Sequence, residues 1–129
     1  MSGPVAETVS CGSGVLALVR SGASACRVHE FFLALLTALF RRGQRLDAVF
    51  FTARAVTLSS SLLGEGSAPW RLQRAYLQLA EYSGCELLVC GRALHSSGLD
   101  PKALQDNFQA AGELELSAKL SRASRVLEY

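Results

Sequence analysis

Short apolar runs alternate along this chain with longer stretches in which apolar residues recur every three or four positions. The short runs have the length and composition of buried strands: residues 15–20, 46–52, 86–90 and 125–129. The longer stretches predict helices: residues 25–42, 69–83 and 113–123, with a short helix from residue 91 to near Gly98. This alternation predicts an α/β fold, with a mostly parallel sheet of about five strands and helices on both faces in a Rossmann-like three-layer arrangement.

Capping residues mark the ends of the two longer predicted helices. Ser24 precedes the first of them as a candidate N-cap, and Gly43 follows its last turn. Pro69 suits the first turn of the second helix, and Gly84 ends it. These four positions predict helix boundaries from local sequence alone.

Three segments lack a sustained hydrophobic period. Residues 1–14 predict a flexible N-terminal tail, which leaves residues 15–129 as a single domain. Residues 53–68 are rich in serine and glycine and predict a loop. Asp100 and Pro101 are typical of an N-cap followed by the first helical residue, so residues 102–111 are predicted to be helical at first.

The composition excludes several classes of protein. The 129 residues carry a net charge of +2, which argues against nucleic-acid binding by phosphate attraction, since that needs a strongly basic face. No stretch reaches the ~18–20 continuous apolar residues of a membrane span, and residues 1–12 lack the regions of a secretory signal. A cytoplasmic protein without membrane or direct nucleic-acid partners is therefore expected.

A cysteine lies where the strand at residues 86–90 meets the following helix. Open α/β sheets place their ligands at the carboxyl ends of strands, and Cys90 is at such an end. The first N–H groups of the helix and the charge of Arg92 favour an anionic sulfur, while Gly91 lets a partner approach it closely. A small buried apolar residue is the alternative, since free cysteine is often buried. The residues alone leave both interpretations open.

Other chemical candidates are weaker. His95 is a candidate for a minor role in proton transfer, but five helical positions turn it away from Cys90. Cys26 and His29 lie three apart on a predicted helix, yet two ligands without a second pair do not predict a metal site. No glycine-rich dinucleotide motif, P-loop or Gly-x-Ser-x-Gly elbow is present, so no cofactor is expected.

Several segments occur in an order and spacing that one known family shares. The most specific is Leu88–Gly98, and others match around it: Val15–Val19, Leu46–Phe51, Trp70–Leu79, Gly84–Leu94 and the ending Leu120–Tyr129. On these residues the chain resembles the DsrE/DsrF-like sulfur-relay family, and it is most similar to the TusD (DsrE) branch of that family.

The resemblance implies a sulfurtransferase subunit that carries sulfur as a persulfide on Cys90. It implies an upstream sulfur donor protein and a small acceptor protein of the TusE/DsrC type, which receives the sulfur on a C-terminal cysteine. It further implies related subunits of the TusB and TusC types in a heterohexamer, or a homo-oligomer. The destination of the sulfur is either 2-thiouridine in transfer RNA or dissimilatory sulfur oxidation.

One departure from the family pattern lies beside the expected site. After Phe51 the family tends to have an aromatic residue and then an acidic residue with a glycine, whereas this chain has Thr52-Ala53-Arg54-Ala55. The pocket wall opposite the cysteine is therefore expected to differ. This difference favours the alternative hypothesis, a non-catalytic assembly or scaffold subunit of the same type of complex.

Overall fold

The computed structural model describes residues 6–9 and 14–128, which form one mixed β-sheet with helices on both faces. The strands are β1 (Ala6–Val9), β2 (Val15–Val19), β3 (Leu46–Phe51), β4 (Glu86–Cys90), β5 (Phe108–Ala111) and β6 (Arg125–Glu128). Their order in the sheet is β1-β6-β2-β3-β4-β5. Strands β2 to β6 are parallel, and β1 pairs antiparallel with β6 at one edge. The predicted α/β fold is confirmed.

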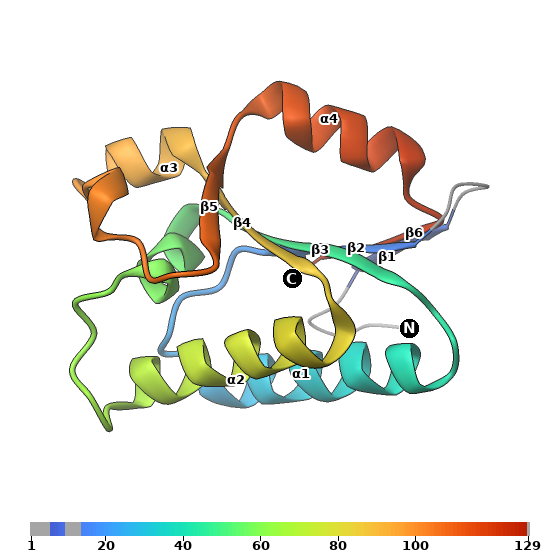
Figure 1. Cartoon of the computed structure of the whole chain (residues 1–129), viewed down its shortest axis with the longest axis horizontal. Helices are drawn as coiled ribbons and strands as arrows, with labels where there is room; N and C mark the ends of the chain where they lie inside the picture. The colour runs from blue at the N-terminus through green and yellow to red at the C-terminus, as the bar shows by residue number, and fades with distance from the viewer. Residues whose placement is uncertain (1–5, 10–13, 129) are drawn as a thin grey trace.

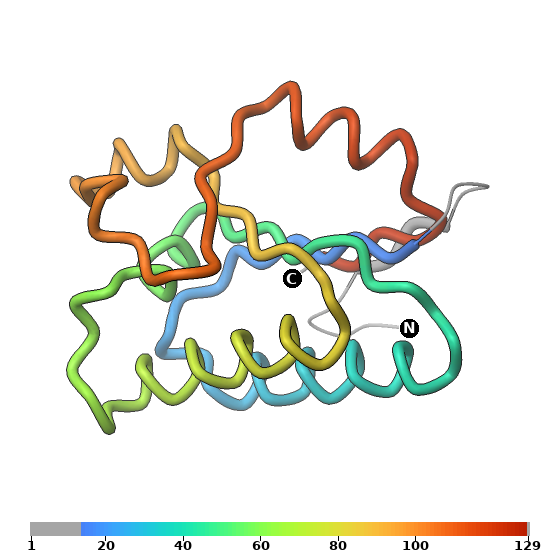
Figure 2. The backbone as a smooth tube through the Cα atoms, in the orientation of Figure 1, coloured from blue at the N-terminus to red at the C-terminus, as the bar shows by residue number. Residues whose placement is uncertain are grey.

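Two helices cover each face of this sheet, as Figure 1 shows. The pair α1 (Cys26–Arg41) and α2 (Ala68–Ser83) lies on one face, and the pair α3 (Gly91–Ser96) and α4 (Glu113–Arg122) lies on the other. Two short 3-10 helices, η1 (Ala53–Ser59) and η2 (Pro101–Ala103), lie beyond the ends of β3 and α3. The backbone trace brings their segments side by side (Figure 2), where Ser61 N–H donates to the carbonyl of Ala103 at 2.7 Å.

The sheet is buried on both faces, so its central strands are apolar over most of their length rather than alternating, with Asp47 and Glu86 near the starts of β3 and β4 as the exceptions. All five residues of β2 are buried. On the α1 and α2 side, β2 and β3 pack against large side chains from both helices, including Phe32, Leu36 and Tyr76. On the other side, Leu16, Phe50, Leu88 and their neighbours form a second cluster. This packing holds β3 and β4, whose carboxyl ends carry the candidate site.

Pro69 and Gly84 lie at the two ends of α2 as predicted, and Ser67, which was not predicted, is its N-cap. The Ser67 hydroxyl accepts a hydrogen bond from Trp70 N–H, and Pro69 lies in the first turn. Gly84 ends the helix in the left-handed conformation, with φ of 78°, and its N–H donates to the carbonyl of Ala80 at 2.7 Å. Glycine adopts this conformation without the steric cost that a Cβ would add.

The start of α1 differs from the prediction. Ala25, not Ser24, is the N-cap, and no side chain caps the helix. The reason is a turn in which Ala25 N–H donates to the carbonyl of Gly22 at 3.1 Å, so Ser24 lies within the turn and the helix begins after it. The predicted N-cap at Ser24 is therefore wrong.

Residues 102–111 are not helical beyond one turn. The Asp100 carboxylate accepts from Lys102 N–H at 2.9 Å, as expected of an N-cap, but η2 ends at Ala103. Asn107 has φ of 77°, which no helix interior allows, and Phe108–Ala111 then pairs with β4. Phe108 packs against Phe51 with ring centroids 5.5 Å apart, so long-range burial stabilises β5 against local helix propensity.

Residues 53–68 also differ from the predicted loop, because the first half is the buried 3-10 helix η1. Ala55, Val56 and Leu58 are fully buried there. A segment that contributes three core residues is part of the scaffold rather than a solvated connection. Its apolar residues thus complete one end of the core.

Part of the predicted tail is a strand, since Ala6–Val9 forms β1. The rest of residues 1–13, and Tyr129 at the end of the predicted last strand, lie outside the described residues. No helix in residues 6–9 and 14–128 has the length and apolar character needed to span a membrane.

Candidate functional site

Cys90 lies at the carboxyl end of β4 and is the N-cap residue of α3. Its strand is held between β3 and β5, and Cys90 pairs in register with Ala111. The residue is half-buried. Two hollows open beside it in the described part of the chain, and both are lined by Cys90 and Arg92. The half-buried cysteine thus lies at the edge of the sheet between two concave surfaces.

The large hollow, of about 670 Å³, lies between α3 and the segment that follows β3. Its walls are made of Gly22, Thr52, Ala53, Arg54, Thr57, Cys90, Arg92, Ala93, Ser96 and Ser97. The small hollow, of about 380 Å³, lies between α3 and the start of α4 and adds Ala111–Leu114 to Cys90 and Arg92. These walls come from the carboxyl ends of neighbouring parallel strands, where α/β folds place their ligands.

Arg92 has an ion-pair partner of its own. Its Nη2 lies 3.1 Å from Oε1 of Glu113, so the pair connects α3 to the first turn of α4. Both side chains are mostly exposed, and solvent screens the pair. The ion pair with Glu113 therefore offsets part of the positive charge that Arg92 brings to the neighbourhood of Cys90.

The other two residues of the predicted site, Gly91 and His95, lie in different surroundings. A Cβ at Gly91 would lie 3.7 Å from the carbonyl oxygen of Ala111, an ordinary contact. Its expected role, access for a partner, therefore stays a prediction. His95 is exposed and lines neither hollow, so the structure does not bring it to Cys90.

His29 is fully buried and has a structural environment. Its Nε2 lies 2.9 Å and 3.0 Å from the carbonyl oxygens of Ser21 and Gly22, and its Nδ1 lies 2.8 Å from the hydroxyl of Tyr76. Two carbonyl oxygens at Nε2 require the proton there, so Nδ1 accepts from the Tyr76 O–H. Burial lowers the pKa of His29, which favours this neutral form.

His29 and Cys26, the two candidate metal ligands, do not form part of a metal centre in the described residues. The Cys26 thiol donates to the carbonyl oxygen of Ala23 at 3.2 Å, and no group of three or more His, Cys, Asp or Glu side chains in residues 6–9 and 14–128 is placed to hold a metal ion. Instead, His29 holds the turn at Ser21 and Gly22, and Gly22 lines the large hollow. Sequence reasoning missed this role, which a lone histidine within an apolar helix could have indicated.

Acidification is expected to destabilise the fold through His29. The folded-state pKa lies below the ordinary value of 6.5, so below pH 6.5 the unfolded chain binds more protons than the folded chain. The free energy of unfolding should fall as the pH drops from 6.5 toward the lowered pKa. Urea denaturation at several pH values should show this decrease in the free energy of unfolding, both in the protein and in the His95→Gln control. A His29→Gln variant with the same slope would contradict the prediction.

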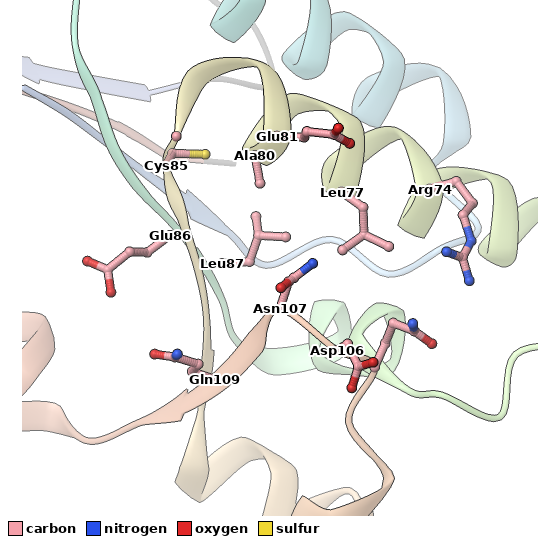
Figure 3. Close-up of a pocket in the computed structure, with 12 residues that line it drawn as sticks. Arg74, Leu77, Ala80, Glu81, Cys85, Glu86, Leu87, Asp106, Asn107 and Gln109 are labelled. Atoms are coloured by element: carbon pink, nitrogen blue, oxygen red, sulfur yellow. The ribbon is translucent and has the colours of Figure 1, made fainter.

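Cys85, at the opposite end of β4, is 6% exposed. Burial raises the pKa of its thiol, which opposes thiolate formation. It lines a separate pocket between α2, β4 and β5, whose other walls include Arg74, Asp106 and Gln109 (Figure 3). That pocket does not include Cys90. Cys85, just before β4, and Cys90, at its end, therefore have different environments: the first is buried and the second lies at an open edge.

The wall of the large hollow is anchored by a residue that the sequence did not single out. Gln73 is 1% exposed, and its amide N–H groups donate to the carbonyls of Leu58 and Ser60 at 2.8 Å and 2.7 Å. It thus ties the end of η1 to α2. At the other end of η1, Ala53 adopts the left-handed conformation with φ of 53° and presents Arg54 at the hollow.

A model of the DsrE/DsrF-like family matches residues 14–129. The chain belongs to the DsrE/DsrF-like family. This confirms the resemblance drawn from the segments around Leu88–Gly98, and it places Cys90 within the matched region.

Individual relatives of this DsrE/DsrF-like protein are distant. It is 34% identical over 76 residues to a protein of Serratia proteamaculans named sulfurtransferase TusD, a match that covers 57% of this chain and only 59% of that protein. The solved ychN protein of E. coli superimposes with a TM-score of 0.72 at 19% identity, over 91% of this chain and 99% of the other. The protein of unknown function MTH1491 of Methanobacterium thermoautotrophicum gives 0.67 at 12% identity, over 92% and 100%. At these identities the two structures show the shared fold.

Proposed function

We propose that this DsrE/DsrF-like protein is a sulfurtransferase subunit that carries sulfur as a persulfide on Cys90. The observation that supports it is the position of Cys90, half-buried at the carboxyl edge of the sheet and shared by two hollows. Cys85 is buried in the core, and Cys26 donates its thiol to a backbone carbonyl and lines neither hollow. Cys85 borders a different pocket but is only 6% exposed, so among the described cysteines Cys90 is the one that is both partly exposed and next to a concave surface.

Sulfur transfer at this site needs only thiol chemistry. The Cys90 thiolate attacks the outer sulfur of a donor persulfide, a new S–S bond forms at Cys90, and the donor leaves as its thiolate. A thiolate of the acceptor then attacks the outer sulfur of the Cys90 persulfide, which returns Cys90 as a thiolate. No electrons are gained or lost overall, so the cycle requires neither metal nor organic cofactor.

The surroundings of Cys90 suit an anionic sulfur. Because Cys90 is the N-cap of α3, the N–H groups of the first turn have no acceptor within the helix and follow directly after the thiol. Arg92 lines both hollows and brings a positive charge close to the cysteine, which Glu113 partly offsets on the side of the small hollow. Nearby positive charge and unpaired N–H groups stabilise thiolates and, by the same physics, persulfides.

The proposed sulfur donor, sulfur acceptor and neighbouring subunits follow from the resemblance to the family. A donor protein would load Cys90, and a small acceptor of the TusE/DsrC type would take the sulfur on a C-terminal cysteine. Sibling subunits of the TusB and TusC types, or further copies of this chain, would complete the assembly. The sulfur would serve 2-thiouridine formation or sulfur oxidation.

Intact mass measurement after incubation with a persulfide donor tests the proposal. The protein should gain the mass of one sulfur atom, and peptide mapping should place it on Cys90. The Cys90→Ser variant should gain none there, while the matched Cys85→Ser variant should load normally. A folded protein whose Cys90 takes no sulfur would instead favour the scaffold hypothesis, which the altered Thr52–Ala55 segment had suggested.

A further inference from the structure

The large hollow beside Cys90 has an unbalanced charge. Two arginines, Arg54 and Arg92, line it, and no acidic residue does. The small hollow contains Arg92 together with its partner Glu113, whose Oε1 lies 3.1 Å from the guanidinium. Positive charge is therefore compensated on one side of the thiol and left in excess on the other.

Arg54 accounts for this excess. Its side chain is exposed, and within the described part of the chain it forms no ion pair with a carboxylate. It follows Ala53, whose φ of 53° is uncommon for a residue other than glycine. Such backbone conformations persist where the surrounding structure imposes them, and they occur often at functional sites.

The backbone of Arg54 is also fixed from the opposite wall. A Cβ placed on Gly22 would lie 3.3 Å from the Cβ of Arg54, so the two segments are in close contact. Gly22 belongs to the turn that the buried His29 holds by hydrogen bonds to the carbonyls of Ser21 and Gly22. The backbone that carries Arg54 is therefore held against the wall of the hollow rather than on a free loop, so its charge stays at the hollow.

The shape of the site favours an extended occupant. Because both hollows are lined by Cys90, a ligand that fills both of them extends along this residue from one side to the other. Their volumes, about 670 and 380 Å³, are of the size that accommodates several side chains rather than a single small anion. Leu114, which lines the small hollow and is 88% exposed, offers an apolar contact beyond the Arg92–Glu113 pair.

We propose that the large hollow binds an acidic polypeptide segment that presents the thiol or persulfide exchanging sulfur with Cys90. In this arrangement Arg54 selects the charge of the segment, and Leu114 contacts an apolar residue on the other side of the cysteine. The inference rests on the proposed function, because it names the kind of partner that the reactive thiol meets. Arg54 acts as a specificity-determining residue and takes no part in the bond exchange.

Two cysteine peptides of equal length, one with glutamates and one with lysines around the cysteine, test this charge selection. Each is prepared as a mixed disulfide with thionitrobenzoate. Attack by the Cys90 thiolate forms a disulfide with the peptide and releases thionitrobenzoate as a thiolate, which is followed by its absorbance. At low ionic strength the acidic peptide should react about ten times faster than the basic one, as expected for electrostatic steering. Salt at about 0.5 M should remove most of the difference.

Charge variants identify the residue responsible. Arg54→Glu should reverse the preference, and Arg54→Gln should reduce it, with unfolding midpoints confirming that both variants fold. Arg71→Glu makes the same change at an exposed position that lines neither hollow, and it should leave the preference intact. The Cys90→Ser variant gives the background rate of the other thiols.

The possible failures are distinguishable. Equal rates for the two peptides, or a preference unchanged in Arg54→Glu, would overturn the acidic-segment proposal while leaving a reactive Cys90. A Cys90 that reacts with neither peptide nor with the small neutral disulfide 2,2′-dithiodipyridine would overturn the proposed function and this inference together.

Discussion

Native protein treated with a limiting amount of iodoacetamide is expected to be alkylated at Cys90 at least about ten times faster than at Cys85, because both access and thiolate formation govern the rate. Cys90 is half-buried and borders two hollows, whereas Cys85 is 6% exposed and burial raises the pKa of its thiol. Cys26 should fall between them, since its thiol donates to the carbonyl of Ala23. Peptide mapping after timed quenching measures the individual rates.

Cys90 and Cys85 lie at opposite ends of the same strand segment and differ in their burial, so comparing them measures the effect of burial on alkylation within one protein. In denaturant the difference should disappear, since the fold alone creates it. Comparable native rates for the two cysteines would show that Cys90 is not preferentially reachable, and the sulfur-carrier proposal would lose its physical basis. The Cys90→Ser variant should leave the slow rate of Cys85 unchanged.

Gln73→Glu is expected to lower the free energy of unfolding by about 3 kcal/mol or more. The substitution would bury a carboxylate that has no N–H group to donate to the two backbone carbonyl oxygens beside it. The amide of Gln73 donates at 2.8 Å and 2.7 Å to the carbonyls of Leu58 and Ser60. An ionised carboxylate would repel both oxygens, and a protonated one could donate to only one of them. The loss should shrink as the pH falls, because protonation removes the buried charge.

Gln78→Glu provides the matched control for this change. Gln78 lies on the same helix and is exposed, so the same substitution should alter the free energy of unfolding little. Chemical denaturation of the two variants at pH 7 and at lower pH measures both the difference and its pH dependence. Equal stabilities would mean that the bonds from Gln73 to the end of η1 contribute little. The rate of Cys90 alkylation in the Gln73→Glu variant would show whether the loss of these hydrogen bonds also alters the wall of the large hollow.

The α/β class, the strand-end position of Cys90 and the family could all be predicted from the amino-acid sequence. Buried parallel strands need continuous apolar runs, and β2, β3 and β4 show them clearly. Local signals also set the ends of α2, where Ser67, Pro69 and Gly84 act through bonds and backbone angles within the segment. A cysteine that follows such a run and precedes a helix must lie at a strand end, whatever the rest of the chain does.

Elements and contacts that depend on partners distant in the sequence became visible in the folded structure. Phe108–Ala111 becomes a strand because β4 pairs with it and Phe51 packs on Phe108, and a four-residue segment carries no period that could show this. The pairing of Arg92 with Glu113, the bond between His29 and Tyr76, and the approach of Arg54 to the hollow of Cys90 join residues far apart in sequence. Such contacts arise from packing of whole elements, so spacing along the chain does not encode them.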